Sequence, residues 1–98
     1  MAEPLVTCPV EEAIRIIGGK WKLLVLRSLL LNGAQRYNEL LTTVTAISQK
    51  ELTRNLRELT KAGLVTATTG RYDLTKLGKG LMPTFKKLLT WGTHLPVR

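Results

Sequence analysis

Residues 47–63, ISQKELTRNLRELTKAG, are the stretch around which the rest of the chain is organised. Ser48 is followed three residues later by Glu51, the spacing of a capping box, in which each side chain accepts a hydrogen bond from the other residue's backbone N–H at a helix start. Gly63 supplies the residue type that most often ends a helix. The stretch therefore predicts a helix over residues 48–62.

This helix has an apolar side and a cationic side. At about 100° per residue, three leucines fall within about 60° of one another, and four cations fall within a similar arc about opposite. The leucines are Leu52, Leu56 and Leu59, and the cations are Lys50, Arg54, Arg57 and Lys61. The sequence therefore predicts that one side packs in a core and that the other stays exposed.

Basic side chains on the outer side of a surface helix are often simply solvated. Here Glu51 and Glu58 lie to one flank, so we expect the four cations to lack ion-pair partners along the helix. A row of like charges repels itself. This pattern favours a negatively charged partner over mere solvation.

Composition supports a polyanionic partner. The chain has 98 residues, with 15 Lys and Arg against 7 Asp and Glu, a formal charge of +8 and an isoelectric point near 10.2. Such an excess is typical of proteins that bind nucleic acids or anionic membranes. The length predicts one small domain over residues 1–98, which is marginal as a lone unit and would gain from a partner subunit.

Several other classes of protein fit poorly. The apolar runs are far shorter than the roughly 20 residues that cross a bilayer, and residues 1–7 do not resemble a leader, so we expect a cytoplasmic, nucleoid-associated protein without membrane contact. One cysteine and one histidine leave no set of ligands for a structural zinc site. Scattered acids and a histidine near the end, His94, argue against an enzyme. We expect no catalytic residues, metal or cofactor.

The N-terminal third predicts a loose arm over residues 1–7 and two helices. Cys8 precedes Pro9, which suits the first turn of a helix, and Gly18-Gly19 would end that helix. Residues 20–31, KWKLLVLRSLLL, are apolar nearly all round, as in a helix buried in the middle of a domain. In this second helix we expect the water-facing residues to be Lys22, Arg27 and Ser28.

The middle of the chain predicts a helix-turn-helix. Arg36 and Tyr37 are interpreted as a short strand, and Asn38 as the cap of a helix that runs to Val44. The helix over residues 48–62 follows after a short connection. Two helices joined in this way, with the exposed charge on the second, are the arrangement in which the second helix enters the major groove of DNA.

After Gly63 the pattern changes to that of a β-hairpin over residues 64–74. A two-residue turn at Thr69-Gly70, a weaker signal than Asn-Gly, would join strands over residues 64–68 and 71–74. This register pairs Ala67 with Tyr72 and Val65 with Leu74. A hairpin directly behind a recognition helix is a wing.

The C-terminal segment predicts a helix over residues 76–92, capped by Thr75, with an apolar arc about 140° wide. Pro83 should kink or divide it near Lys79 and Gly80. So broad an arc predicts a dimer interface, although a small domain could also need a wide apolar stripe for its own core. The expected interface residues are Leu81, Met82, Phe85, Leu88, Leu89 and Trp91.

In this order the elements form a mainly α domain with a small hairpin, and the chain resembles the winged helix-turn-helix regulators of the HxlR family, relatives of the MarR group. The residues that carry the resemblance span about positions 8–92. They include Cys8-Pro9-Val10-Glu11, Ile17-Gly18-Gly19-Lys20-Trp21, Arg36-Tyr37-Asn38-Glu39-Leu40, Ile47-Ser48-Gln49-Lys50, Leu56-Arg57-Glu58-Leu59, Gly63-Leu64-Val65, Tyr72-Asp73-Leu74-Thr75 and Trp91-Gly92.

The resemblance implies a transcriptional activator or repressor that binds a pseudo-palindromic operator as a homodimer, through N- and C-terminal dimerisation helices. It also implies a recognition helix matching residues 48–62 in the major groove. Family hairpins are usually longer and contain proline, so the short Thr69-Gly70 connection departs from the pattern and leaves minor-groove contact by the wing open.

Residues in the first turns of a recognition helix approach base edges, whereas cations further along or outside it hold phosphates. We therefore expect base contacts from Gln49, Lys50, Thr53 and Arg54, and phosphate contacts from Arg57, Lys61, Arg36 and Arg71. The predicted DNA-binding residues are Arg36, Ser48, Gln49, Lys50, Thr53, Arg54, Arg57, Lys61 and Arg71.

Cys8 stands at a predicted helix N-terminus, where the helix dipole lowers the pKa of a thiol. Several relatives sense oxidants or electrophiles through a cysteine at the matching position, so the resemblance implies a redox-sensing role. Alkylation and a cross-link between two subunits are both open. The alternative is a small buried residue.

Two other functions remain open, and the sequence does not tell whether a small-molecule effector binds. A non-specific or architectural nucleic-acid-binding protein would use the same charge without base preference. An adaptor would dock the basic helix on an acidic protein or membrane surface.

Overall fold

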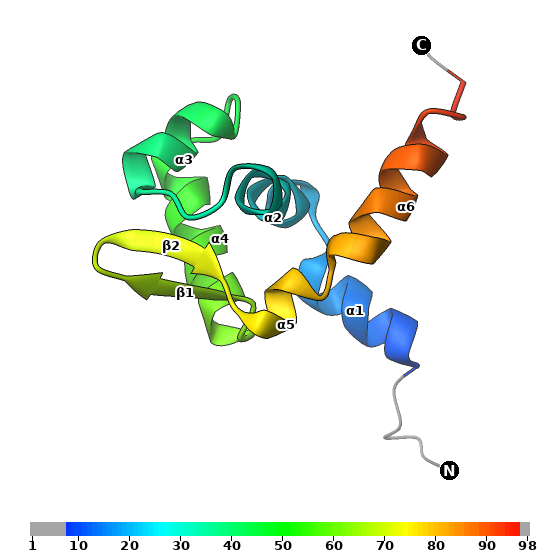
Figure 1. The fold of residues 1–98 in the computed structure, drawn as a ribbon, viewed down its shortest axis with the longest axis horizontal. Coiled ribbons are helices and arrows are strands. Elements are labelled where there is room, and N and C mark those ends of the chain that lie inside the picture. The colour runs from blue at the N-terminus through cyan, green and yellow to red at the C-terminus, as the bar shows by residue number, and fades with distance from the viewer. Residues whose placement is uncertain (1–7, 97–98) are drawn as a thin grey trace.

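A computed structural model of the chain describes residues 8–96, so the predicted arm over residues 1–7 lies outside the described residues. The elements are α1 (Pro9–Ile17), α2 (Lys20–Asn32), α3 (Tyr37–Thr43), α4 (Gln49–Lys61), β1 (Val65–Thr68), β2 (Arg71–Leu74), α5 (Lys76–Lys79) and α6 (Met82–Gly92). Figure 1 shows α2 in the middle, with α3, α4 and the hairpin on one side and α1 and α6 extending away on the other. The predicted winged helix-turn-helix fold is confirmed.

The core forms where the leucine side of α4 packs against α2. Leu52, Leu56 and Leu59 are buried as predicted. They meet Val25, Leu26 and Leu29 of α2 in one hydrophobic cluster that also includes residues of α3 and of the hairpin. Burial of a leucine contributes about 1.5–3 kcal/mol, so this contact fixes which side of α4 faces outward.

The prediction that Ser28 faces water was wrong, because Ser28 is only 4% exposed. Its hydroxyl lies 2.7 Å from the Thr43 hydroxyl and accepts a hydrogen bond from the Gln35 amide at 3.0 Å. A polar side chain can be buried at little cost when it is hydrogen-bonded in this way. Leu31, by contrast, lies on the exposed side of α2.

The start of α3 differs from its prediction by a few residues. Arg36, not Asn38, is the N-cap, and the Glu39 carboxylate accepts a hydrogen bond from the Arg36 backbone N–H at 2.7 Å. The short strand predicted at Arg36 and Tyr37 is not found. Instead, Gln35, one residue earlier, forms an isolated β-bridge with Tyr72. There the backbone N–H of Gln35 donates to the Tyr72 carbonyl at 2.9 Å, and the N–H of Tyr72 donates back at 2.7 Å.

The hairpin has the predicted register, with Val65 opposite Leu74 and Ala67 opposite Tyr72. Thr69 and Gly70 have φ values of 50° and 79°. Positive φ at both central residues defines a type I′ turn, whose twist matches that of two antiparallel strands. The bridge from Gln35 adds a backbone connection on the other edge of β2, which ties the hairpin to the segment before α3.

The C-terminal segment is divided into α5 and α6, so a single helix over residues 76–92 is not found, whereas the predicted break near Gly80 is confirmed. The Thr75 hydroxyl caps α5 by accepting a hydrogen bond from the Gly78 backbone N–H at 3.1 Å. α6 then starts at Met82 with Pro83 in its first turn. A proline there costs nothing, since those N–H groups have no partner within the helix.

Candidate nucleic-acid interface

The first turn of α4 is held by Ser48, whose Oγ accepts a hydrogen bond from the backbone N–H of Glu51 at 3.1 Å. This is half of the predicted capping box. The carboxylate of Glu51 instead binds Arg54, with 2.5 Å between Oε1 and Nη2. At its other end, α4 closes through Gly63, which has φ of +83°, while the N–H of Leu64 donates to the Leu59 carbonyl at 3.0 Å.

The expectation that all four cations of α4 lack partners was wrong at Arg54. Arg54 binds Glu51 and also Glu58, 3.5 Å away, and Glu58 binds Lys22 of α2 at 2.7 Å. The Lys22 ammonium, and to a lesser extent Arg54, holds the pKa of the Glu58 carboxyl below its ordinary value. The flanking acids thus neutralise Arg54 and link α4 to α2.

The other three cations of α4 remain available. Within the described part of the chain, Lys50, Arg57 and Lys61 take part in no ion pair, and all three are exposed. An open hollow of about 440 Å³ on the outer side of α4 is lined by Gln49, Lys50, Thr53, Arg54 and Arg57. The structure therefore brings the predicted base-contacting residues together on one exposed side.

Tyr37, at the start of α3, contacts two residues of this hollow, and the sequence did not predict these contacts. Its hydroxyl donates to the backbone carbonyl of Gln49 at 3.0 Å and lies 2.8 Å from the Thr53 hydroxyl. Twelve and sixteen residues separate the partners, so no local pattern signals the contact. Tyr37 fixes the first helix of the helix-turn-helix to the first turn of the second.

Asn55 was also missed. It is 2% exposed, and its side-chain amide donates to the Glu51 carbonyl at 2.7 Å. A signal existed, because Asn55 lies three residues after Leu52 and four before Leu59, on the edge of the leucine side of the helix.

A second hollow, of about 480 Å³, lies between α4 and the hairpin. Its lining combines the cations Arg57 and Lys61 with Ala67 and Tyr72 of the strands and Tyr37 of α3. Arg36 reaches the turn of the hairpin, since a Cβ added to Gly70 would lie 3.2 Å from its Nη1 atom. Arg71 follows Gly70 and is exposed. The predicted phosphate contacts thus flank the outer side of α4.

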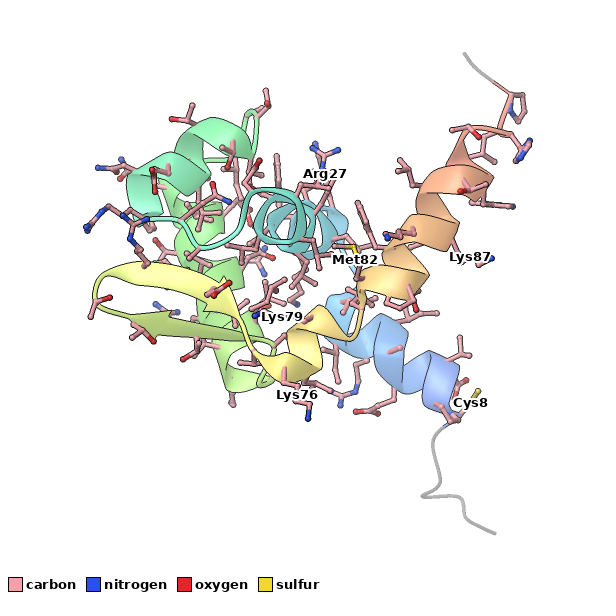
Figure 2. All side chains as sticks on the ribbon, viewed as in Figure 1. Cys8, Arg27, Lys76, Lys79, Met82 and Lys87 are labelled. Atoms are coloured by element: carbon pink, nitrogen blue, oxygen red, sulfur yellow. The ribbon has the colours of Figure 1, made fainter. Side chains whose placement is uncertain are left out.

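Cys8 is exposed at the N-terminus of α1, so it is not the small buried core residue that the sequence left open as an alternative. The backbone N–H groups of Glu11 and Val10, at the start of α1, lower the pKa of its thiol. Figure 2 shows Cys8 at the outer end of α1, on the opposite side of the molecule from the hairpin turn. The thiol is therefore accessible and remote from α4.

The predicted dimer residues divide into two groups. Leu81 packs against the core, and Met82 and Phe85 are half-buried. Further along α6 the apolar side chains are exposed, by 42% at Leu88 and by 61% at both Leu89 and Trp91. α1 likewise exposes Val10 and Ile14.

Comparison with known proteins decides the family. The family model described as HxlR-like helix-turn-helix matches residues 16–97. The chain belongs to the HxlR-like family. It is 40% identical over 92 residues to an uncharacterised HTH-type transcriptional regulator of Methanothermobacter thermautotrophicus, an alignment that covers 87% of this chain and 70% of that protein. This HxlR-like chain is therefore a DNA-binding transcriptional regulator of the helix-turn-helix type, and its family consists of regulators rather than enzymes.

Solved structures agree with the assignment. A MarR-family transcriptional regulator from Porphyromonas gingivalis superposes on the HxlR-like chain with a TM-score of 0.84 at 27% identity, covering 98% of both chains. Quinone-bound YodB from Bacillus subtilis superposes with a TM-score of 0.82 at 31% identity, covering 90% of this chain and 100% of that chain. The MarR-like relationship predicted from the sequence is confirmed.

Two further observations concern other classes of protein. Over residues 8–96, no helix has the length and apolar character needed to cross a membrane. Among the same residues, histidine, cysteine and acidic side chains form no cluster of three that could hold a metal ion.

Proposed function

We propose that this HxlR-like protein is a homodimeric, sequence-specific regulator whose α4 helices enter adjacent major grooves of a pseudo-palindromic operator, and that Cys8 controls its release. The observation that carries the proposal is the outer side of α4. Gln49, Lys50 and Thr53 share one hollow there, while the leucines on the opposite side are fixed in the core.

Different side chains on this surface would perform different tasks. Gln49 can bind adenine and Lys50 can bind guanine through their major-groove edges. Arg57 and Lys61, closer to the hairpin, are suited to phosphates, as are Arg36 and Arg71 at its turn. Arg54 would have to exchange its carboxylate partners for DNA, so we assign it a smaller share of the affinity than Arg57.

The second subunit would cover α6 and α1. Exposed Leu88, Leu89 and Trp91 on α6, and Val10 and Ile14 on α1, are the large apolar side chains that a monomer leaves in water. Their burial would stabilise a dimer, since buried apolar area contributes about 25 cal/mol per Å². Such a dimer would place two α4 helices about 34 Å apart, one turn of B-DNA.

Cys8 would act as a nucleophile towards electrophiles. Its thiolate would add to a ring carbon of a quinone, forming an S–C bond, while the electron pair moves to a quinone oxygen that takes up a proton and becomes a hydroxyl. The likeness to YodB, which has been solved with a quinone bound, supports this choice of electrophile. An adduct at Cys8 would stand on α1, beside the apolar surface assigned to the second subunit.

The DNA part of the proposal is tested by selecting binding sequences from random duplexes, then comparing affinities for the selected site and a scrambled duplex of equal length. We expect a preference of at least about 10³ at physiological salt, and two bound chains per site. Equal affinity for both duplexes would instead favour a non-specific nucleic-acid-binding protein.

The Cys8 part is tested on the same complex with benzoquinone. We expect the quinone to release the wild-type protein from its site and to leave Cys8→Ser bound. Because serine differs from cysteine by one atom, this variant is a matched control. Equal release of both proteins would remove Cys8 as the sensor.

A further inference from the structure

Tyr37 controls more than the position of α4, because it also determines where the proton of Thr53 points. The two hydrogen bonds of the Tyr37 hydroxyl have different partners. The Gln49 carbonyl, 3.0 Å away, can only accept, whereas the Thr53 hydroxyl, 2.8 Å away, can donate or accept. This asymmetry decides the direction of both bonds.

A tyrosine hydroxyl has a single proton and lone pairs that accept. If that proton pointed to Thr53, a lone pair of the Tyr37 oxygen would face a lone pair of the Gln49 carbonyl oxygen with no proton between them, and the two oxygens would repel each other. The proton therefore goes to Gln49. The hydrogen bond to Thr53 must then be donated by Thr53, and the Tyr37 oxygen accepts it.

The consequence is that Thr53 has no proton left for DNA. Thr53 is exposed and lines the hollow on the outer side of α4 beside Gln49 and Lys50. Towards that side its hydroxyl offers only lone pairs. In the major groove, an acceptor can bind the amino groups of adenine or cytosine, whereas guanine and thymine present the acceptors O6 and O4 at the corresponding place.

From this geometry we infer that Tyr37 is a specificity-determining residue, which makes Thr53 an obligate acceptor and so selects an amino base, adenine or cytosine, at one position of each half-site. The inference rests on the proposed function, since it requires that α4 contact base edges. Tyr37 is a positioning residue, because it acts through Thr53.

The experiment measures base preference rather than affinity alone. Duplexes derived from the selected site, each with one base pair changed, are bound by the wild type, by Tyr37→Phe and by two variants of Thr53. Tyr37→Phe keeps the half-buried ring and removes the hydroxyl. Thr53→Val removes the acceptor at almost constant shape, and Thr53→Ser retains it as the conservative control.

We expect the wild type and Thr53→Ser to prefer an amino base over a keto base by about two- to tenfold at one position, the discrimination of a single hydrogen bond. Thr53→Val should lose this preference. Tyr37→Phe should lose it at the same position, because the freed Thr53 hydroxyl can turn and donate to O6 or O4. The double variant that combines Tyr37→Phe with Thr53→Val should show the same base preference as Thr53→Val alone.

A purely structural role for Tyr37 would weaken binding to all duplexes equally, and that result would overturn the inference. The inference would also be overturned if Tyr37→Phe kept the preference for an amino base. The same holds if Tyr37→Phe lost a preference at a different base-pair position from the one affected by Thr53→Val. In both cases the proposed function stands. Equal affinity of the wild type for every duplex would overturn the proposed function and this inference together.

Discussion

The two sides of this molecule differ in how completely side chains find hydrogen-bond partners, ion-pair partners or burial within a single chain. Around α4, polar groups are held by the Tyr37 hydroxyl and by the ion pairs of Arg54 and Glu58, and the leucines are buried. Along α6, Leu89 and Trp91 lie 61% exposed. The difference teaches that the surface proposed to face DNA is organised within one chain, whereas the α6 surface would gain its stability from a second copy.

The largest effect should come from placing a charge on the α6 surface. Leu89→Glu would require burial of a carboxylate in the proposed interface, so we expect a monomer. A monomer loses the benefit of two linked half-sites, and affinity for the operator should fall by about 100-fold or more. Ultracentrifugation and gel-shift titration measure the two results.

Thr90→Glu is the matched control, because Thr90 is exposed on the same helix but lies about 100° around it from Leu89. It should remain a dimer and keep its affinity within a few-fold. A Leu89→Glu protein that is still dimeric would show that the exposed leucines do not mark the interface.

The next effect distinguishes the two arginines of α4. Arg57→Ala should lower operator affinity by about tenfold or more, as a charge-assisted hydrogen bond contributes about 1.5–3 kcal/mol. It should also reduce the slope of log K against log salt by about 0.9 for each phosphate that the variant no longer neutralises. Arg54→Ala should have a smaller effect on both, because Glu51 and Glu58 already bind Arg54.

Titrations of both variants over a series of salt concentrations make the comparison. Glu51→Gln adds a control, since it removes one carboxylate from Arg54 and should strengthen DNA binding. An equal fall in affinity for the two alanine variants would mean that DNA displaces the carboxylates without cost.

The smallest effect concerns the pH dependence of Cys8. The backbone N–H groups of Glu11 and Val10 lower the pKa of its thiol in the folded protein. The thiolate is therefore more abundant near neutral pH in the folded protein than in the unfolded chain, where those N–H groups are no longer held near the sulfur. We expect alkylation by iodoacetamide to reach half its maximal rate at a lower pH in the native protein than in urea. Coinciding curves would show that α1 does not activate the thiol.

Features that depend on local pattern were predicted from the sequence. The leucine side of α4 follows from helical periodicity, the hairpin register from a two-residue turn, and the break before α6 from Pro83. Each of these involves residues a few positions apart in the chain. Their physical causes therefore lie within one element or between two consecutive ones.

Polar contacts between elements were not predicted. The buried side chains of Ser28 and Gln35 form a hydrogen-bonded network with Thr43 between α2, α3 and the segment that joins them, and nothing in the sequence marks Ser28 as buried. Likewise, the partner of Glu58 on α2 is Lys22, 36 positions away in the sequence. Where polar groups meet across elements, their pairing depends on side-chain geometry that periodicity does not describe.

The break between α5 and α6 has a consequence for how such regulators diverge. Gly80 and Leu81 set the angle at which α6 leaves the body, and α4 lies on the opposite side of α2 (Figure 1). In the proposed dimer, that angle would govern the spacing between the two half-sites, while α4 governs their base composition. In that dimer, substitutions at Gly80 or Leu81 would change the operator spacing that a descendant accepts without altering the bases it recognises, so the two properties would evolve independently.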